Sequence, residues 1–89
     1  MKKSMKLILL TPDNEFFSGD IISLNCETSD GRRGILPNHC SMIAELVPSS
    51  IKFKDLENKQ YEVLISDGVL KVDKNKILIL CGSANWIKK

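Results

Sequence analysis

The feature that most constrains this chain is a short-range alternation of apolar and polar residues, with turn residues after every few positions. Over residues 22–27 the two kinds mostly alternate, as expected of a strand with one buried face. Residues 51–54 and 61–65 predict one hairpin, and residues 70–72 and 77–80 predict another, each around a short polar turn. Strands spaced about 8–12 residues apart with turns between them favour a β-sandwich or barrel.

Turn residues set the remaining boundaries. Residues 5–10 predict an extended segment that is apolar on both faces and ends at the Thr-Pro-Asp-Asn turn of residues 11–14. The Ser-Gly-Asp sequence at 18–20 predicts a second break in the chain. The spacing in residues 42–47 fits either one amphipathic helical turn or a buried strand, because so few residues cannot decide the period. Residues 82–89 are expected to form a short tail.

Composition limits the class of protein. The chain has 89 residues, of which 43% are hydrophobic and 27% charged, so we expect a single globular domain over residues 1–89. A net charge of +2 gives no reason to expect nucleic-acid binding. The apolar runs 7–10 and 77–81 fall far short of the roughly 20 residues that a membrane-spanning helix needs. The run at 7–10 is also too short for a secretory signal, which predicts a chain kept in the cytosol.

The cysteines predict neither disulfides nor a metal centre. Cys26, Cys40 and Cys81 form an odd set without Cys-x-x-Cys spacing, whereas small secreted domains usually carry an even, dense set. A zinc site would need all the thiols to meet at His39, the single histidine of the sequence. We therefore expect free thiols in a reducing compartment and no bound metal.

No catalytic set stands out in the sequence. His39 and Cys40 are adjacent, and neighbouring side chains on an extended strand point to opposite faces, which disfavours a nucleophile–base pair. Gly31 and Gly34 are not followed by the helix and lysine of a phosphate-binding loop. The sequence therefore predicts a protein without a catalytic residue or a cofactor.

Two features could carry a binding function. Arg32 and Arg33, the only arginines, lie between Gly31 and Gly34, so a projecting glycine-flanked loop could grip carboxylates or phosphates. A solvated turn is an equal alternative for these arginines. Residues 31–39 as a whole predict a short strand that runs into an exposed loop, because Pro37 cannot donate to a ladder. Lys74 lies at the tip of the second predicted hairpin, where lipoyl and biotinyl carrier domains display a modified lysine. Its Asp and Asn neighbours are unlike the Met-Lys-Met pattern of biotinyl domains.

A longer pattern accounts for more of the chain. Residues 31–39 read G-R-R-G-I-L-P-N-H and are followed by L-V-P at 46–48. Residues 10–12 read L-T-P, residues 17–19 read F-S-G, and residues 67–80 read D-G-V-L-K-V-D-K-N-K-I-L-I-L. In this order and spacing the segments resemble the epsilon subunit of bacterial and chloroplast rotary ATP synthases, which is called delta in mitochondria.

The resemblance covers nearly all of residues 5–86, with local departures. Asn38 stands where the family has a glycine, and Ser41 stands where it has a proline. Each departure relaxes a turn without removing a strand. Family members commonly continue into a C-terminal helical hairpin that can restrain ATP hydrolysis, and this sequence stops before it. If the sequence is complete, we expect a subunit that neither binds ATP nor restrains hydrolysis through its own tail.

The resemblance implies a fold and a role. The fold would be an all-β, flattened antiparallel sandwich of about ten short strands. The role would be that of a non-catalytic central-stalk subunit that couples ion-driven rotation to ATP synthesis, peripheral on the cytoplasmic face of the plasma membrane. Its partners would be the gamma subunit and the c-ring, with the alpha and beta subunits in the same complex. A free-standing carrier or binding domain with a modified Lys74 is the alternative.

Matched residue by residue, the resemblance also implies two contact sets. The c-ring-facing set is Asp30, Arg32 and Arg33. The set near gamma is Thr11, Phe16, His39, Met42 and Ile43. For Met42 and Ile43, ordinary core packing is a strong alternative.

Overall fold

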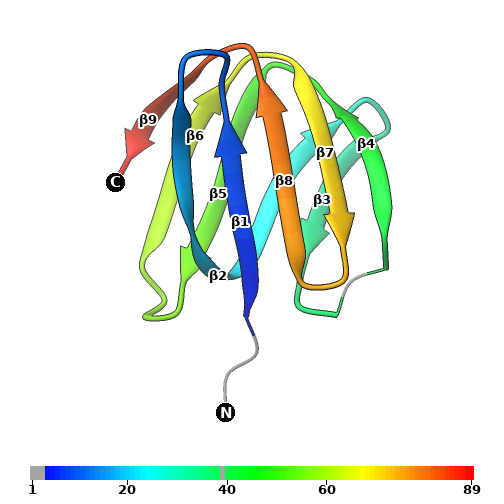
Figure 1. Cartoon of the computed structure of the whole chain (residues 1–89), viewed down its shortest axis with the longest axis vertical. Coiled ribbons are helices and arrows are strands. Elements are labelled where there is room, and N and C mark those ends of the chain that lie inside the picture. The colour runs from blue at the N-terminus through cyan, green and yellow to red at the C-terminus, as the bar shows by residue number, and fades with distance from the viewer. Residues whose placement is uncertain (1–3, 39) are drawn as a thin grey trace.

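The structure, a computed structural model, describes residues 4–38 and 40–89. Within those residues the chain forms nine strands and no helix, which confirms the predicted all-β class (Figure 1). The strands are β1 (Met5–Leu10), β2 (Glu15–Thr28), β3 (Gly31–Ile35), β4 (Met42–Leu46), β5 (Ser49–Asp55), β6 (Gln60–Ile65), β7 (Gly68–Asp73), β8 (Lys76–Cys81) and β9 (Ala84–Lys88). No described segment is a helix long and apolar enough to span a membrane.

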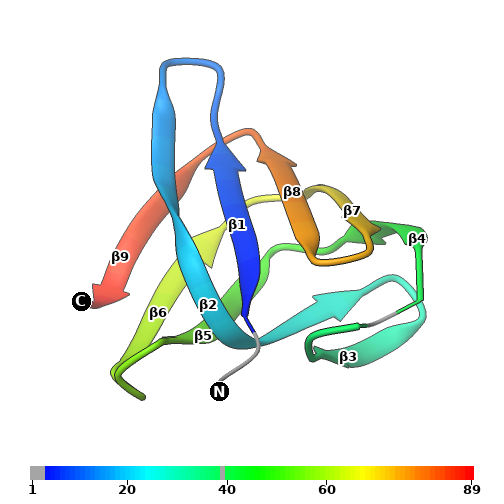
Figure 2. The ribbon, with the colours of Figure 1, turned by 60° about the horizontal axis from the view of Figure 1, so that its bottom comes forward.

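The strands form two layers, which Figure 2 shows from below. We call the layer made of β4, β7, β8, β1 and the first half of β2 the front sheet, because it faces the viewer in Figure 1. The back sheet contains the second half of β2 together with β3, β5, β6 and β9. The pair β1–β8 runs parallel, and the other pairs run antiparallel.

Strand β2 holds the two layers together because it belongs to both. Its first half pairs with β1, where Met5 lies opposite Ile21. Its second half pairs with β5 and β3, and the pairing with β5 shifts register between Ile21 and Ser23. An irregularity of this kind bends a strand and increases its twist, which turns β2 from one sheet into the other. At its end, Thr28 pairs with Leu46 of β4, on the front sheet.

The core lies between the sheets and follows the alternation in the sequence. In β1, Met5, Leu7 and Leu9 are buried, and Ile77 and Ile79 of β8 lie in the same layer. The remaining buried apolar residues are Ile21, Leu24, Cys26, Ile35, Leu46, Ile51, Phe53, Val63, Ile65, Leu70, Val72 and Cys81. The sequence pattern therefore predicts which residues of a strand share its buried face. The pairing of the strands decides which residues they pack against.

The predicted break at residues 18–20 is wrong, because β2 runs without interruption from Glu15 to Thr28. Gly19 lies opposite Leu7 in the pairing with β1. A Cβ atom at Gly19 would come within 3.1 Å of the Phe17 ring. The glycine therefore makes room for an aromatic ring beside the strand, and it does not make a turn.

The predicted tail at residues 82–89 is also wrong for most of its length. Residues Ala84–Lys88 form β9, which pairs with β6 and places Trp86 opposite Val63. The Trp86 ring lies with the other aromatic residues of the chain, at centroid distances of 5.0 Å from Phe16 and 5.9 Å from Tyr61. Five residues give too short a pattern to identify a strand whose partner, β6, lies about twenty positions earlier.

Other ambiguous segments are decided by pairing. The segment 42–47, open between helix and strand, contributes β4, which pairs with β7 through residues 42–46. Both predicted hairpins are present, as β5–β6 and β7–β8. Their turns contain Asn58 and Lys74 with positive φ values of 66° and 58°. Asparagine tolerates this left-handed conformation better than most residues, whereas lysine has no special tolerance for it.

Two of the cysteines lie in the core as free thiols. Cys26 and Cys81 are buried and form no disulfide. Burial raises the pKa of the Cys26 thiol to about 11, although the nearby Arg33 guanidinium acts to lower it. Burial also raises the pKa of Cys81. Both thiols are therefore protonated and unreactive near neutral pH.

Candidate functional site

The outward surface of the front sheet carries large apolar side chains where a water-facing sheet usually carries polar ones. The exposed side chains include Ile43, Val69 and Leu80, with exposed fractions of 73%, 44% and 46%. Ile8, Leu10 and Leu78 are half-buried on the same side. We call these residues the apolar face: Ile8, Leu10, Ile43, Val69, Leu78 and Leu80.

Strand pairing connects five of the six residues of the apolar face. In the β1–β8 pair, Ile8 lies opposite Leu78 and Leu10 lies opposite Leu80. In the β7–β8 pair, Val69 lies opposite Leu80. Directly opposed residues have their Cβ atoms about 4.5–5.5 Å apart, so these side chains touch along the row. A contiguous exposed apolar patch of this kind marks a surface that binds a partner.

Ile43 stands between two shallow hollows at the edge of this face. One hollow, of about 410 Å³, is lined by residues of β4 together with Asp67, Gly68 and Val69. The other, of about 380 Å³, is lined by residues 41–43 and by residues 71–73 of β7. Both are open depressions, so the arrangement fits the side chains of a partner protein better than an enclosed small molecule.

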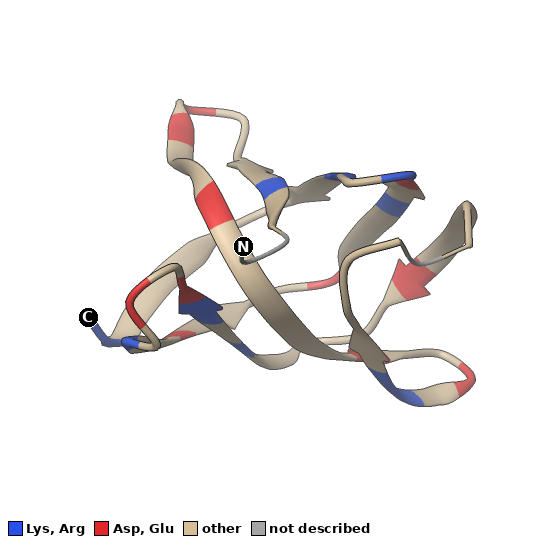
Figure 3. Cartoon of the chain, turned by 90° about the horizontal axis from the view of Figure 1, so that it is seen from below, with Lys and Arg blue, Asp and Glu red and all other residues tan. Residues whose placement is uncertain are grey.

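The charged residues lie on both layers and are not gathered into one patch. Figure 3 views the molecule from below, with Lys and Arg interspersed among Asp and Glu on both sheets. On the apolar face, Lys71 lies between Ile43 and Leu78 in the cross-strand register. The aliphatic stem of a lysine can lie along apolar neighbours while its ammonium stays in water. Lys71, together with the exposed Glu45 opposite Val69, therefore places charged groups next to Ile43 at this edge of the apolar face.

The predicted gamma contacts fall in different places. Ile43 lies on the apolar face, and Thr11 begins the β1–β2 turn directly after Leu10, where its amide donates to the Asn14 carbonyl at 2.9 Å. Met42 lies on the other side of β4 and packs against the core. Phe16 is half-buried at a bulge between β1 and β2, with its ring 5.0 Å from that of Trp86. His39 lies outside the described residues.

Residue-by-residue matching missed most of the apolar face. Ile8, Leu10, Val69, Leu78 and Leu80 were not among the predicted contacts. A signal for two of them was present, because residues 5–10 are apolar on both faces of the predicted strand. A strand whose outer face meets water usually carries polar residues on that face. The second apolar set was therefore a signal that a partner covers the outer face.

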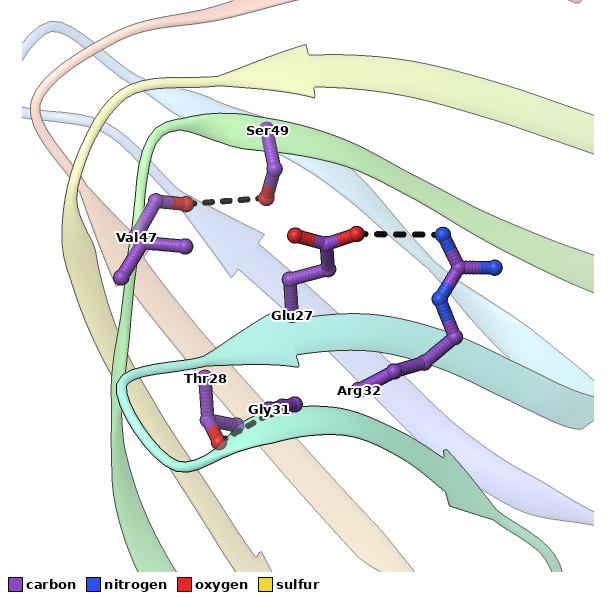
Figure 4. Close-up of polar contacts among 6 residues, drawn as sticks. All are labelled: Glu27, Thr28, Gly31, Arg32, Val47 and Ser49. Carbon is purple, nitrogen blue, oxygen red and sulfur yellow. Dashed lines mark hydrogen bonds and ion pairs between the residues drawn. The ribbon is translucent and has the colours of Figure 1, made fainter.

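The arginine segment lies in a strand, which confirms the short strand predicted within residues 31–39, and it does not form the projecting glycine-flanked loop considered for the two arginines. Residues Gly31–Ile35 form β3, and the turn before it lies at Ser29 and Asp30. Gly31 has a φ of 118°, a value that non-glycine residues rarely adopt. The Thr28 hydroxyl donates to the Gly31 carbonyl at 2.9 Å and accepts the Asp30 amide at 3.1 Å. These bonds make the turn a defined structure, and Figure 4 draws the one between Thr28 and Gly31.

The two arginines do not act as a pair. Arg32 lies opposite Glu27 and forms an ion pair with it, the Nη2 and Oε1 atoms being 3.1 Å apart (Figure 4). Arg33 lies opposite Cys26, so strand alternation places it on the other side of β3. Both side chains are exposed, as is Asp30 in the turn. The β2–β3 hairpin therefore presents one charge on each side and a carboxylate at its tip.

The described residues offer no site for a metal ion, since no group of three potential ligands occurs among them. Lys74 lies at the β7–β8 turn, as predicted for a hairpin tip. Its neighbour Asn75 accepts the backbone N–H of Asn38 at 2.7 Å through its side chain. The tip is therefore tied to a neighbouring segment and does not stand clear of the domain.

Comparison with known families gives one match along nearly the whole chain. Residues 4–87 match the family described as "ATP synthase, Delta/Epsilon chain, beta-sandwich domain". The sequence is 38% identical over 86 residues to the ATP synthase epsilon chain of Clostridium novyi, covering 97% of this chain and 66% of that one. It is 38% identical over 84 residues to the ATP synthase epsilon chain of Clostridium botulinum strain Hall, covering 94% and 63%. The chain thus spans slightly less than two thirds of the length of these relatives.

Two solved structures share the fold. A chain in the Euglena gracilis mitochondrial ATP synthase superposes with a TM-score of 0.89 at 20% identity, covering 93% of this chain and 53% of that one. A chain in the central stalk and c-ring of the Tetrahymena thermophila mitochondrial ATP synthase gives a TM-score of 0.76 at 19% identity, covering 96% and 69%. At these identities the likeness concerns the fold.

Proposed function

The chain belongs to the family of ATP synthase delta/epsilon β-sandwich domains, and from this premise we propose that it is a non-catalytic subunit of the central stalk of a rotary ATP synthase. The subunit would couple the ion-driven rotation of the c-ring to ATP synthesis by docking the gamma subunit onto the ring. The observation that carries the proposal is the family match over residues 4–87, together with relatives named ATP synthase epsilon chain.

The geometry supports a binding role over a catalytic one. The apolar face is broad and bordered by shallow hollows, which suits a protein partner. The buried thiols are held protonated, and the described residues contain no cluster of metal ligands. In the proposed role the domain supplies stiffness and two contact surfaces, while the catalytic alpha and beta subunits bind the nucleotides.

We assign the gamma contact to the apolar face, centred on Ile43 and Leu80. A rotor part must stay attached while torque passes through it, so its main interface needs a large apolar area that is removed from water on assembly. The six residues of the apolar face provide such an area on one side of a stiff sheet. Thr11 extends it at the β1–β2 turn. Phe16 and Met42 serve the internal packing in this assignment.

We assign the c-ring contact to the β2–β3 hairpin, with Asp30 at its turn and Arg32 and Arg33 on its two sides. Exposed charges at the tip of a short hairpin can meet polar loops of a neighbouring subunit. Because Arg32 is already paired with Glu27, it would have to exchange that partner for a carboxylate of the ring. Arg33 has no ion pair among the described residues and is the freer charge.

The proposal also covers location and coupling ion. A subunit that docks on a membrane-embedded ring is a peripheral protein, here on the cytoplasmic face of the plasma membrane. The ring would carry protons or sodium ions, and both fit the present contacts equally. Neither the gamma nor the c-ring contact requires ATP bound to this chain.

The direct test is co-purification from host membranes with the tagged full chain. We expect gamma, the c subunit, alpha and beta to come with it, and Ile43→Asp to reduce the recovery of gamma, alpha and beta because a charge would be buried in an apolar interface. Recovery of the tagged chain alone would reject the stalk role. An added acyl or biotinyl mass on Lys74 of the native protein would instead support the carrier alternative.

A further inference from the structure

The turn between β7 and β8 makes side-chain hydrogen bonds to the segment that leads into β4. The backbone N–H of Asn38 donates to Asn75 Oδ1 at 2.7 Å, and Asn75 Nδ2 lies 3.5 Å from Asn38 Oδ1. The Ser41 hydroxyl donates to Asp73 Oδ1 at 3.2 Å. The turn therefore holds this segment at two points, one on each side of residue 39.

Asn75 is well placed to hold another segment because its own backbone is fixed. The backbone N–H of Lys6, in β1, donates to the Asn75 carbonyl at 2.8 Å. The side chain of Asn75 thus extends from a turn that is anchored to the front sheet. Asn38 adopts a φ of 67°, a left-handed conformation in which its amide needs a partner outside regular strand pairing.

The held segment determines where β4 begins on the front sheet. Met42 is the first residue of β4 and pairs with Val72, so Ser41 and Asp73 meet one position beyond the last backbone pair. Residues 41–43 and 71–73 line the hollow beside Ile43. The hydrogen bond between Ser41 and Asp73 therefore lies at one end of this hollow, and the bond between Asn75 and Asn38 holds the chain four positions before β4 begins.

We propose that Asn75 is a positioning residue for the gamma-docking surface, acting through the Asn38 amide on the start of β4. The inference rests on the proposed gamma contact of the apolar face. Asn75 itself makes no contact with gamma in this scheme. It sets the geometry of the hollow and of Ile43 before binding, so that the interface does not have to order the segment when gamma arrives.

The test combines a local readout with a binding readout. Asn75→Ala should raise the hydrogen-exchange rate of the Asn38 amide in NMR and weaken the affinity for purified gamma subunit about 3- to 10-fold, the value of one hydrogen bond. Asn75→Asp keeps an oxygen that accepts the Asn38 N–H, so it should restore both quantities to within about twofold of the wild type. Lys74→Gln, at the neighbouring turn position, should change neither.

Each outcome decides the matter. Loss of Asn38 protection with unchanged gamma affinity would overturn the positioning role, as would recovery of protection without recovery of affinity in Asn75→Asp. Should Asn75→Ala fail to fold, Asn75→Ser takes its place because its shorter side chain also loses the carbonyl that accepts the Asn38 N–H, and a folded Asn75→Ser with wild-type affinity would reject the proposal. If Leu80→Asp leaves gamma binding intact, the docking surface itself is wrong and the positioning role fails with it. If Leu80→Asp weakens gamma binding and Asn75→Ala does not, only the positioning role of Asn75 is rejected.

Discussion

The outer surfaces of the two sheets differ in how much apolar area they expose. The front sheet carries the apolar face, whereas the back sheet carries Ser23, Asn25, Ser50, Lys52, Lys54, Gln60 and Glu62 at its outward positions. Leu64 is the one large apolar side chain among these outward positions of β5 and β6, with 48% exposed, close to the 46% of Leu80 on the front sheet. Both sheets bury their inner faces in the same core. Packing of the core therefore does not explain the apolar outer surface of the front sheet. Docking of the proposed partner explains it.

This difference shows which half of the molecule is adapted to solvent. On the back sheet, Lys52 lies opposite Asn25 on one side and Glu62 on the other. This polar row is well solvated by water. On the front sheet, the row from Leu10 through Leu80 to Val69 is stabilised when a partner covers it and removes it from water. The following predictions test the contrast, beginning with the largest effect.

The contrast between the two outer surfaces assumes that the core between the sheets is closed to solvent. The reactivity of the buried Cys26 thiol tests this assumption. Its pKa of about 11, against an ordinary value of 9.0, should make its alkylation at pH 8 about 100-fold slower in the folded protein than in the unfolded chain, because the thiolate is the reacting form. Peptide mapping after timed iodoacetamide labelling measures this rate for Cys26 separately. Equal rates with and without urea would show that the core opens freely.

The same pKa shift predicts how stability depends on pH. The folded state binds the Cys26 proton more tightly than the unfolded state does, so the contribution is complete below pH 9 and is lost as the pH rises from about 9 to 11. Urea unfolding at a series of pH values checks the direction. Cys26→Ala is the control that removes the Cys26 share of the dependence, since the raised pKa of Cys81 acts in the same direction. A stability that increases over that range would contradict the buried thiol as its source.

The matched leucines test the contrast directly. Leu80→Asp should weaken gamma binding about 30-fold or more, as expected for a central apolar contact, whereas Leu64→Asp should change it less than about threefold. Because both side chains are about half exposed, the two substitutions should cost similar amounts of folding free energy. Titration of each variant with gamma measures the affinities. Similar losses for both leucines would remove the distinction between the two surfaces.

The back sheet should matter for stability where the front surface matters for binding. Trp86→Ala removes the aromatic contact that attaches β9 to β6 and to Phe16, and should lower the free energy of unfolding by about 2 kcal/mol, less than for a fully buried tryptophan. Urea unfolding gives this value, and Trp86→Phe should recover most of it. Gamma affinity should be unchanged in the folded fraction. A stability equal to the wild type would mean that β9 is not held by its aromatic contact.

The smallest effect is expected at the charged hairpin. Arg32→Ala should change stability by less than about 1 kcal/mol, because its ion pair with Glu27 is largely exposed. The double change Arg32→Glu with Arg33→Glu should weaken the c-ring contact several-fold by adding repulsion, with gamma binding spared. ATP synthesis in reconstituted vesicles measures the coupling. Unaffected synthesis would exclude an electrostatic contact at this hairpin.

Parts of the binding surface were within reach of the sequence, and parts were not. The segment 5–10 showed apolar residues on both faces, and the hairpin turns were marked by Asp, Asn and Lys. The gamma contacts implied by the resemblance stay predictions. Among them Ile43 is exposed, whereas Phe16 and Met42 pack partly against the core, which the place of a residue in a motif does not reveal.

The sequence by itself determined the all-β class, the positions of most strands and which face of each strand is buried, because alternation and turn chemistry act within a few residues. Only the tertiary structure decided that β2 passes through Gly19 into both sheets, that residues 84–88 form a strand on β6, and that Asn75 holds Asn38. These features depend on contacts between residues far apart in the chain. A local pattern cannot specify such contacts, because their energy arises only after the partner segment has been brought alongside.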